Sequence, residues 1–206
     1  MAIDYHKGEI CKIEYKKGDI SSKALEKFYK NLEKHYVTAG IHKEEGAKVI
    51  NVSKNKPFTL IKNACVQEFG YTQTVEKARI ITSPFTKHIA TKGKHKGELI
   101  PNTFYIPEGT ELVIPPRPFV RIFNDKKEKK DLTETFKNQI NVHLEKGDAE
   151  AVYDGVGYLA KWRMRERIDS KKIKPKNAEM TKEYKGSNTP LYMTGELYFG
   201  IESKVH

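Results

Sequence analysis

Ile114-Pro115-Pro116-Arg117-Pro118-Phe119-Val120-Arg121 is the stretch that decides how the chain is organised. Each proline fixes its own φ angle, lacks an N–H donor and pushes the preceding residue toward extended geometry. No helix can cross this segment, and no central strand can contain it. We therefore predict a stiff connector that delivers Phe119 and Val120 into the next packed element.

Arg117 of the connector has two interpretations. Its guanidinium can hold a carboxylate of a neighbouring subunit in a bidentate pair. It can also fold back and donate to carbonyl groups that the prolines leave unpaired, and we favour this interpretation because buried carbonyls need donors. Arg117 and Phe119 are thus candidate contact residues, with a structural alternative for each.

Three further stretches accompany the connector: Val37-Thr38-Ala39-Gly40-Ile41, Val66-Gln67-Glu68-Phe69-Gly70 and Thr189-Pro190-Leu191-Tyr192-Met193-Thr194-Gly195-Glu196-Leu197. In this order, the four stretches resemble the motifs of the tail-completion proteins of tailed bacteriophages, a family of neck, minor tail or virion-morphogenesis proteins. Those proteins have a VGI strand, an EFG turn, a PARPF connector and a terminal PL..TG.L segment. The resemblance extends over about residues 37–205.

The resemblance implies a structural virion protein and not an enzyme. Such a protein forms part of the neck that joins the DNA-filled head to the tail, as a homo-oligomeric ring. Its implied partners are the head connector or adaptor and the tail terminator or tail tube proteins. Its implied location is the virion neck, after assembly in the host cytoplasm, with a non-specific electrostatic contact to packaged DNA.

The composition is that of a soluble globular chain. Its 206 residues, 37% of them hydrophobic, suit a single domain over residues 1–206. No run approaches the ~20 apolar residues that a membrane span needs, and no secretory signal is visible at the start. Cys11 and Cys65 are isolated from each other, which favours a reducing cytoplasm.

The formal net charge of +11 raises the alternative of a stand-alone basic nucleic-acid-binding protein. That function needs a concentrated basic face interleaved with exposed aromatic residues. Here the lysines are spread widely and often lie beside glutamate, as in Lys126–Lys130, and most aromatic residues fall on apolar stripes. The structural function is therefore the one we favour.

Before the connector, the pattern predicts a strand over Glu9–Tyr15, a helix, a strand over residues 36–41 and a helix over Thr59–Phe69 that ends at Gly70. Asp19, Ser21 or Ser22 can cap the first helix. The polar residues 42–60 are expected to form a loop. The first helix has an apolar stripe for the core, made of Leu25, Phe28, Tyr29, Leu32 and Tyr36.

Residues 71–113 are predicted to form a long, projecting β-hairpin arm. Thr74–Thr82 and Phe104–Ile114 are prone to form strands, and they flank a basic, glycine-containing middle section, Lys87–Glu98. This section has no core of its own, so we expect it to be mobile. Its candidate contact residues alternate and would point to one side of an extended chain. They are Lys92, Lys94 and Lys96.

After the connector, the pattern predicts a helical hairpin. A capping box at Asp131–Glu134 would begin the first helix, over Leu132–Leu144, which Gly147 ends. Asp148 would cap the second helix, in which Gly155 and Gly157 make sense if another element approaches closely. The inner face of the second helix is expected to contain Val152, Val156, Leu159, Arg163, Met164 and Ile168.

Trp162 lies off that inner face and is a candidate subunit contact, because tryptophan is enriched at interfaces. The lysine-rich residues 169–188 are expected to form an exposed loop. Thr194 can cap a short helical turn, and residues 197–205 lead into a last strand.

Together these elements predict an α+β fold. A small, mostly antiparallel sheet would combine strands near residues 37–41, 75–82, 104–114 and 197–205. The N-terminal helix and the C-terminal helical hairpin would pack on this sheet, and the β-hairpin arm would project from it.

The sequence contains no pattern that requires catalysis. None of the seven histidines has zinc-ligand spacing, and there is no phosphate-binding glycine loop and no Gly-x-Ser-x-Gly turn. Glu68 is a candidate catalytic carboxylate, but no partner is implied by spacing, so a capping or salt-bridging role is favoured. We therefore expect no catalytic, cofactor-binding or metal-binding residues, with an uncharacterised hydrolase as a third alternative.

Overall fold

The computed structural model describes residues 21–53, 56–170, 173–186, 188–191 and 195–206. The strand expected over Glu9–Tyr15 and the cap expected at Thr194 lie outside these ranges. The described elements are α1 (Ser22–Leu32), β1 (Val37–Gly40), α2 (Lys43–Gly46), β2 (Val49–Ser53), β3 (Lys56–Thr59), α3 (Leu60–Phe69), β4 (Tyr71–Thr74), β5 (Arg79–Ile89), β6 (Leu99–Ile106), β7 (Glu111–Ile114), η1 (Arg121–Asn124), α4 (Lys126–His143), α5 (Ala149–Asp169), α6 (Glu179–Lys185), α7 (Glu196–Phe199) and β8 (Glu202–Val205).

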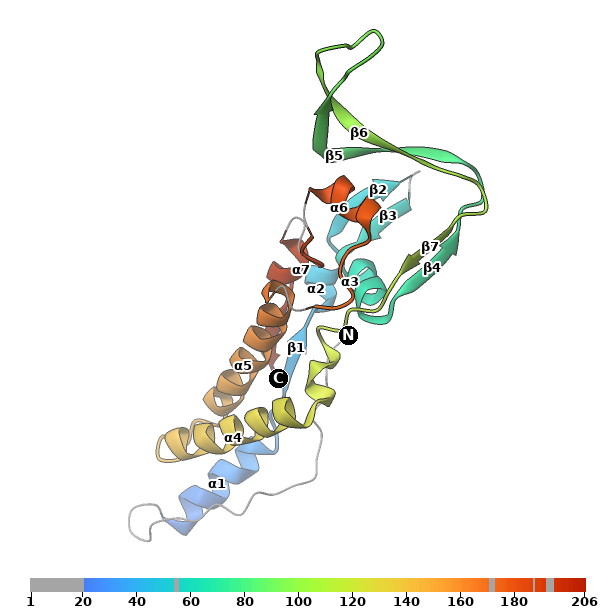
Figure 1. Ribbon diagram of the computed structural model, residues 1–206. Helices are drawn as coiled ribbons and strands as arrows, with labels where there is room; N and C mark the ends of the chain where they lie inside the picture. The colour runs from blue at the N-terminus through green and yellow to red at the C-terminus, as the bar shows by residue number, and fades with distance from the viewer. Residues whose placement is uncertain (1–20, 54–55, 171–172, 187, 192–194) are drawn as a thin grey trace.

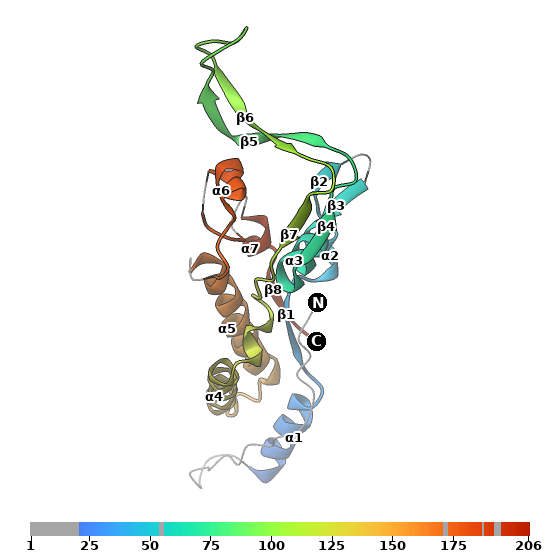
Figure 2. The same ribbon diagram turned by 45° about the vertical axis from the view of Figure 1, so that its right-hand side comes forward.

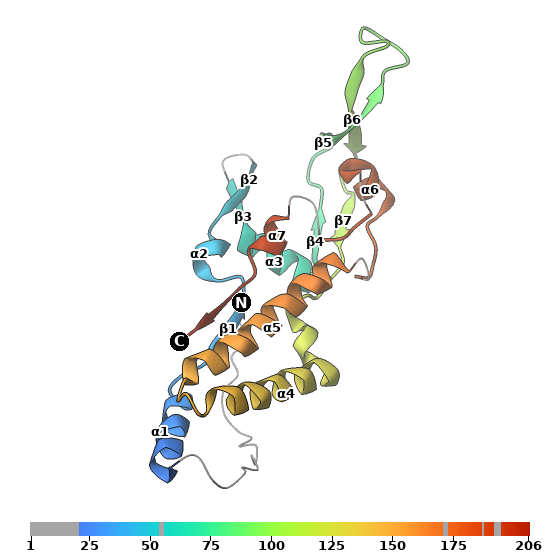
Figure 3. The same ribbon diagram turned by 90° about the vertical axis from the view of Figure 1, so that its left-hand side faces the viewer.

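The predicted α+β class is confirmed, and the strands pair antiparallel. The prediction of one combined sheet is wrong, because the described strands form separate two-stranded ribbons: β1 with β8, β2 with β3, β4 with β7, and β5 with β6. Helices stand between the ribbons. The β1–β8 ribbon lies against α5, whereas β4 and β7 continue from α3 toward the arm (Figures 1 and 3).

The helical hairpin is formed by α4 and α5, and its first helix begins earlier than predicted. Asp125 caps α4 by accepting a hydrogen bond from the Lys127 N–H at 2.8 Å. The helix-favouring lysine-rich turn that follows is therefore part of α4, and Asp131 lies inside the helix. The cap at Asp148 is confirmed, since its carboxylate accepts from the Ala151 N–H at 3.0 Å.

The close approach predicted at the two glycines of α5 is confirmed. A Cβ on Gly157 would lie 2.6 Å from Val37 Cγ2 and 3.0 Å from Ser203 Cβ, so α5 rests directly on the β1–β8 ribbon. A Cβ on Gly155 would meet the side chain of Gln139 in α4 at 2.5 Å. The glycines thus let α5 approach a strand on one side and a helix on the other.

The main core lies where β1, α3, η1, α5 and α7 meet. The connector ends in this core, because Phe119 is fully buried and Val120 and Phe123 are nearly so. The delivery of Phe119 and Val120 into a packed element is thereby confirmed. The buried members of the cluster are Ala39, Ile41, Leu60, Ala64, Phe119, Val120, Phe123, Leu132, Ala160, Met164, Ile168, Leu197 and Ile201.

A second apolar cluster holds α1 against the helical hairpin. The Ser21 hydroxyl caps α1 by accepting from the Ala24 N–H at 3.3 Å. The apolar stripe of α1 packs as predicted, except that Tyr36 lies beyond the end of the helix. The buried members of this cluster are Phe28, Leu32, Ile140, Leu144, Ala149 and Val152.

The predicted arm is a bent hairpin that extends away from the helices (Figures 1 and 2). Its lower part is β4–β7 and its upper part is β5–β6, with a register irregularity between Thr82 and Lys87. The strands reach further than predicted, since residues 87–89 of the expected middle section belong to β5. The tip is residues 90–98.

The side of the arm rests on α6. The hydroxyls of Ser83 and Thr86 donate to the backbone carbonyls of Tyr184 and Glu183, respectively. The Tyr184 ring lies 6.3 Å from the ring of Phe104. The upper part of the arm is therefore attached to the body, while the tip extends past α6.

The two polar segments predicted as loops contain regular structure. Residues 42–60 include α2 and the β2–β3 hairpin, and residues 169–188 include α6. Ile173 is 1% exposed, so the second segment is anchored in the interior and is not a free loop. Both predictions are wrong because short elements that pack on one side need few apolar residues. None of the helices in the described ranges combines the length and apolar composition that a membrane span requires.

Candidate assembly surfaces

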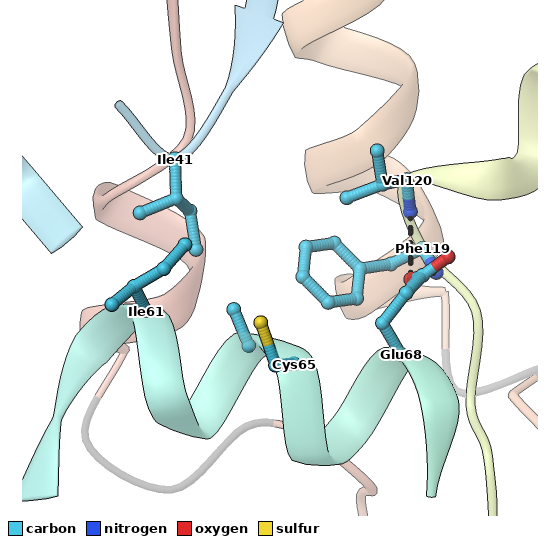
Figure 4. A pocket seen from close by; sticks show the side chains of 7 residues that line it. Ile41, Ile61, Cys65, Glu68, Phe119 and Val120 are labelled. Atoms are coloured by element: carbon cyan, nitrogen blue, oxygen red, sulfur yellow. Dashed lines mark hydrogen bonds between the residues drawn. The ribbon is translucent and has the colours of Figure 1, made fainter. Parts of the chain in front are cut away.

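The buried carboxylate of Glu68 binds the backbone that leaves the connector. Glu68 lies in the last turn of α3 and is 1% exposed. Its Oε2 accepts the N–H groups of Phe119 at 2.8 Å and Val120 at 3.1 Å, and its Oε1 accepts the N–H of Arg121 at 3.0 Å. Figure 4 shows Glu68 turned from the helix toward this backbone. We call Glu68 and residues 119–121 the Glu68 clamp.

The prolines explain why one carboxylate suffices for this turn. Pro115, Pro116 and Pro118 have no N–H to satisfy. The remaining N–H in that part of the connector, from Arg117, donates to the carbonyl of Gln67 at 2.6 Å. The last turn of α3 therefore accepts every backbone donor from residue 115 to residue 121, which confirms the predicted capping and salt-bridging role of Glu68.

Gly70 lets the connector lie against the end of α3. It has a φ of +80°, and a Cβ at this position would lie 2.9 Å from the Ile114 carbonyl oxygen and 3.0 Å from the Pro116 nitrogen. A side chain would meet backbone atoms there, and the positive φ also favours glycine. The Glu-Phe-Gly turn and the proline connector are therefore one packed unit.

Arg117 is buried, and its side chain bonds within the chain. Its Nε donates to the Pro175 carbonyl at 2.8 Å, and one terminal nitrogen donates to the Lys176 carbonyl at 3.2 Å. Arg117 therefore binds carbonyls of its own chain, as favoured, but the expectation that it folds back onto carbonyls of the connector is wrong, because its acceptors belong to the segment before α6. Burial lowers the pKa of the Arg117 guanidinium. Burial, and next the charge of Arg117, lowers the pKa of the Lys185 ammonium.

The cavity beside the Glu68 clamp is too small for a substrate. Its volume is about 10 Å³, the space of a single water molecule. Figure 4 shows the labelled side chains around it. Both oxygens of Glu68 are already engaged, so this carboxylate is held as a structural group. The cavity is lined by Ile41, Ile61, Ala64, Cys65, Glu68, Phe119 and Val120.

A larger open groove of about 680 Å³ lies between η1, the start of α4 and the end of α5. Its charges are mixed: it is lined by three arginines and three carboxylates among other residues. Arg163 lies 2.8 Å from Asp131, 3.5 Å from Glu128 and 3.3 Å from Glu166. This network ties α4 to α5 and leaves the groove without an excess of either charge.

Trp162 lies on the outer face of α5. It is 46% exposed, as expected for a residue off the inner face, and the Arg163 guanidinium lies 5.2 Å from its ring centroid. Tyr158, four residues earlier, is 66% exposed on the same face. Carboxylates continue this line in both directions. We define the α5 stripe as Glu150, Asp154, Tyr158, Trp162, Glu166 and Asp169, all of them exposed.

The arm has an apolar face turned away from α6. The cross-strand partners Ile80 and Tyr105 are 70% and 66% exposed, and the partners Ile89 and Leu99 are each 63% exposed. Exposure alternates along β6, so Leu99 and Tyr105 share a face opposite Phe104. We define these two pairs as the outer arm face.

The three lysines of the arm tip are exposed but do not form an extended row. Residues 94–97 form a turn, in which the Gly97 N–H donates to the Ala90 carbonyl at 2.8 Å and the Lys96 N–H donates to the Gly93 carbonyl at 3.2 Å. The expectation that Lys92, Lys94 and Lys96 point to one side of an extended chain is therefore wrong. They instead surround a compact tip.

Sequence reasoning missed both the α5 stripe and the outer arm face. The signal for the stripe was an i, i+4 series of carboxylates and aromatic residues opposite Val152 and Met164. The signal for the outer arm face was the presence of two apolar residues on each of the strands β5 and β6. That no other element covers these residues is seen only in the structure. Of the predicted contact residues, Arg117 and Phe119 are buried, whereas Trp162 is exposed on α5 and the three lysines are exposed on the arm tip.

In the part of the chain that the structure describes, no group of three or more histidine, cysteine, aspartate or glutamate residues is arranged to hold a metal ion. No protein-family model matches the chain, and comparisons with curated proteins and with solved structures gave no match either.

Proposed function

We propose that this protein is a structural component of a tailed-bacteriophage virion. In this proposal it forms part of the neck that joins the DNA-filled head to the tail, as a homo-oligomeric ring. Its partners are the head connector or adaptor on one side and the tail terminator or tail tube proteins on the other. It assembles in the host cytoplasm and remains in the virion.

One observation supports the proposal most strongly. The four stretches that resemble tail-completion motifs are far apart in sequence, yet residues of three of them meet in the main core, and Glu68 of the remaining stretch binds the backbone of Phe119 in that core. Ala39 and Ile41, Phe119 with Val120, and Leu197 represent these three stretches in that cluster. Motifs that build one core are expected from a shared fold rather than from chance similarity of short segments.

The chemistry of the described residues favours binding over catalysis. The carboxylate of Glu68 is fully engaged, and the cavity beside it holds no more than one water molecule. The exposed features are instead extended surfaces: the arm and the outer face of α5. We propose that these surfaces, and not a reaction centre, carry the function.

The test is to delete the gene from the phage that encodes it and to image the resulting particles. We expect DNA-filled heads and separate tails, and joined particles when the intact gene is supplied in trans. Normal infectious particles without the gene would exclude the proposal.

The net charge of +11 supports a second candidate function, stand-alone nucleic-acid binding. Changing Lys92, Lys94 and Lys96 together to glutamate tests it. If the tip binds DNA, the loss should be large and the salt dependence should flatten by up to about three phosphate contacts. We expect DNA affinity to change little, because these lysines are a small part of a widely spread charge. The matched control changes Lys126, Lys127 and Lys130 of α4 to glutamate.

A further inference from the structure

The α5 stripe is an acidic surface on a basic protein. Glu150 and Asp154 are exposed, and neither forms an ion pair with another described residue. Three of the four cations of α5 are paired: Lys161 and Arg165 with Glu202, and Arg163 within the α4 network, whereas Arg167 lies near Glu166 at the far end of the helix from Glu150 and Asp154. The stripe therefore presents two aromatic side chains next to two unpaired carboxylates, Glu150 and Asp154, while Glu166 beyond Trp162 is paired with Arg163.

The arm presents the complementary surface. Its outer face has two apolar cross-strand pairs, and basic side chains lie beside and beyond them. Lys87 pairs across the ribbon with Pro101, and Lys92, Lys94 and Lys96 occupy the tip. The one carboxylate of the tip, on Glu98, lies 2.7 Å from His95. The arm thus combines exposed apolar surface with an excess of positive charge.

The two surfaces cannot meet within one chain. The arm is attached to α6 through Ser83 and Thr86, and its outer face points away from that contact. The first turns of α5 lie at the opposite end of the molecule, next to α4 and α1 (Figures 1 and 3). A contact between arm and stripe therefore requires two molecules.

We infer that the outer arm face and tip of one copy bind the α5 stripe of a second copy. The Ile89–Leu99 pair, which lies nearest the tip, covers Tyr158 and Trp162, and the lysines of the tip approach Glu150 and Asp154. Burial of large apolar side chains supplies the affinity, while charge complementarity supplies orientation and association rate. Each copy binds one neighbour through its arm and another neighbour through its α5 stripe, so the contact is heterologous. Such a contact repeats from copy to copy and forms either a closed ring or an open filament.

This inference rests on the proposed oligomeric assembly, and its test is a disulfide cross-link between two single-cysteine chains. Cys11 and Cys65 are first changed to serine. One chain then carries Leu99→Cys on the outer arm face, and the other carries Tyr158→Cys in the stripe. The control partner carries Val142→Cys, a 60% exposed apolar position on α4 outside both surfaces.

We expect a cross-linked dimer from Leu99→Cys with Tyr158→Cys, and at least about tenfold less from the Val142→Cys control. Equal yields from the two pairs would overturn the inference. Glu150→Lys with Asp154→Lys should reduce the yield about tenfold, and pairing that chain with an arm carrying Lys92→Glu, Lys94→Glu and Lys96→Glu should restore it. Failure of the exchanged charges to restore cross-linking would also count against it.

Other occupants of these surfaces give different results. If residues 1–20 of the same chain cover the stripe, their deletion should raise the cross-link yield several-fold. This result would overturn the inference that the stripe of the intact chain is open to a second copy. If DNA occupies the arm, short duplex DNA should abolish the cross-link at physiological salt, and this result would overturn the assignment of the arm to a second copy. Two phage experiments separate the two proposals. Joined particles that carry the cysteine pair but show no cross-link would reject this contact alone. Normal particles from a phage that lacks the gene would reject the neck function alone.

Discussion

Glu68 and Arg121 form an ion pair whose two members lie in different environments. Oε1 of Glu68 lies 2.9 Å from Nε of Arg121, but the Glu68 side chain is 1% exposed and the Arg121 side chain is 42% exposed. Arg121 also lies over the ring of Phe69 at 4.7 Å and donates to the Glu68 carbonyl. The buried charge is therefore satisfied mainly by fixed backbone donors, with the arginine closing the solvent side.

The first prediction concerns this asymmetry. Glu68→Gln should lower the free energy of unfolding by about 3 kcal/mol, because the amide NH₂ would face donors where the carboxylate accepted hydrogen bonds. Arg121→Gln should cost only about 1 kcal/mol, since three backbone N–H groups still bind Glu68. Denaturant unfolding measures both. Equal losses would show that the arginine, and not the backbone, is the main partner of Glu68.

Substitutions in the connector can distinguish the stability that comes from burying Phe119 from the stability that comes from the stiffness of the prolines. Phe119→Ala should lower the free energy of unfolding by ~3–5 kcal/mol, because it empties a fully buried core position. Pro116→Gly combined with Pro118→Gly should cost about 1 kcal/mol per site, because the unfolded chain gains freedom. Thermal melts of the two variants should rank in this order. The reverse order would mean that the stiffness of the connector matters more than its anchor.

Gly155 and Gly157 lie in the same helix, α5, so the same substitution to alanine can be compared at two positions with different neighbours. Gly157→Ala should destabilise by ~1–3 kcal/mol, because its Cβ would press on Val37 and Ser203 of a paired ribbon. Gly155→Ala meets only the flexible side chain of Gln139, so the gain of up to ~1 kcal/mol in helix propensity should offset that contact. Melting temperatures compare the two directly. A Gly157→Ala protein as stable as the wild type would contradict the close contact of α5 with β1–β8.

Tyr153 should make stability sensitive to alkaline pH. Its hydroxyl donates to the Leu32 carbonyl at 2.9 Å, and burial raises its pKa. Because the folded-state pKa is above the unfolded value of about 10, this stabilisation is complete below about pH 10 and is lost as pH rises through the folded-state value. Tyr153→Phe should cost about 1 kcal/mol at pH 7 and progressively less at higher pH.

The quantity to compare is the difference in the free energy of unfolding between the wild type and Tyr153→Phe, measured at each pH. The lowered pKa of Lys185 acts in the opposite direction, since stability rises with pH where the unfolded chain binds more protons. Subtracting the two unfolding curves removes that contribution. A difference that stays constant from pH 7 to about pH 11 would exclude the role of the Tyr153 proton.

The sequence predicted the elements whose signals are local. The stripe of α1, the end of α3 at Gly70, the cap at Asp148 and the close approach at Gly157 all follow from side-chain spacing or backbone rules. The predicted start of α4 was wrong because both Asp125 and Asp131 are residues of a type that can cap a helix. Asp125 does so, and Asp131 bonds to Arg163 of another helix, which no local pattern reveals.

The candidate surfaces were only partly predictable. The sequence favoured carbonyl binding by Arg117, but it pointed to the wrong carbonyls, because the acceptors at Pro175 and Lys176 are brought to Arg117 only by the tertiary fold. Trp162 was correctly placed off the inner face. The α5 stripe and the outer arm face depend on what other elements leave uncovered, and residue types alone do not specify burial.

The arm leaves the body after Gly70 and returns at Ile114, and these ends are adjacent because Tyr71 and Ile114 are register partners. A hairpin that starts and finishes at one paired position can lengthen or shorten in steps of matched residues, and the cost of closing a longer loop grows only slowly. Insertion, deletion or replacement of the hairpin therefore leaves the Glu68 clamp in place. Over evolutionary time, the exposed surface of the arm is therefore free to diverge while the residues that build the core stay the same. The same junction is a graft site for a foreign hairpin.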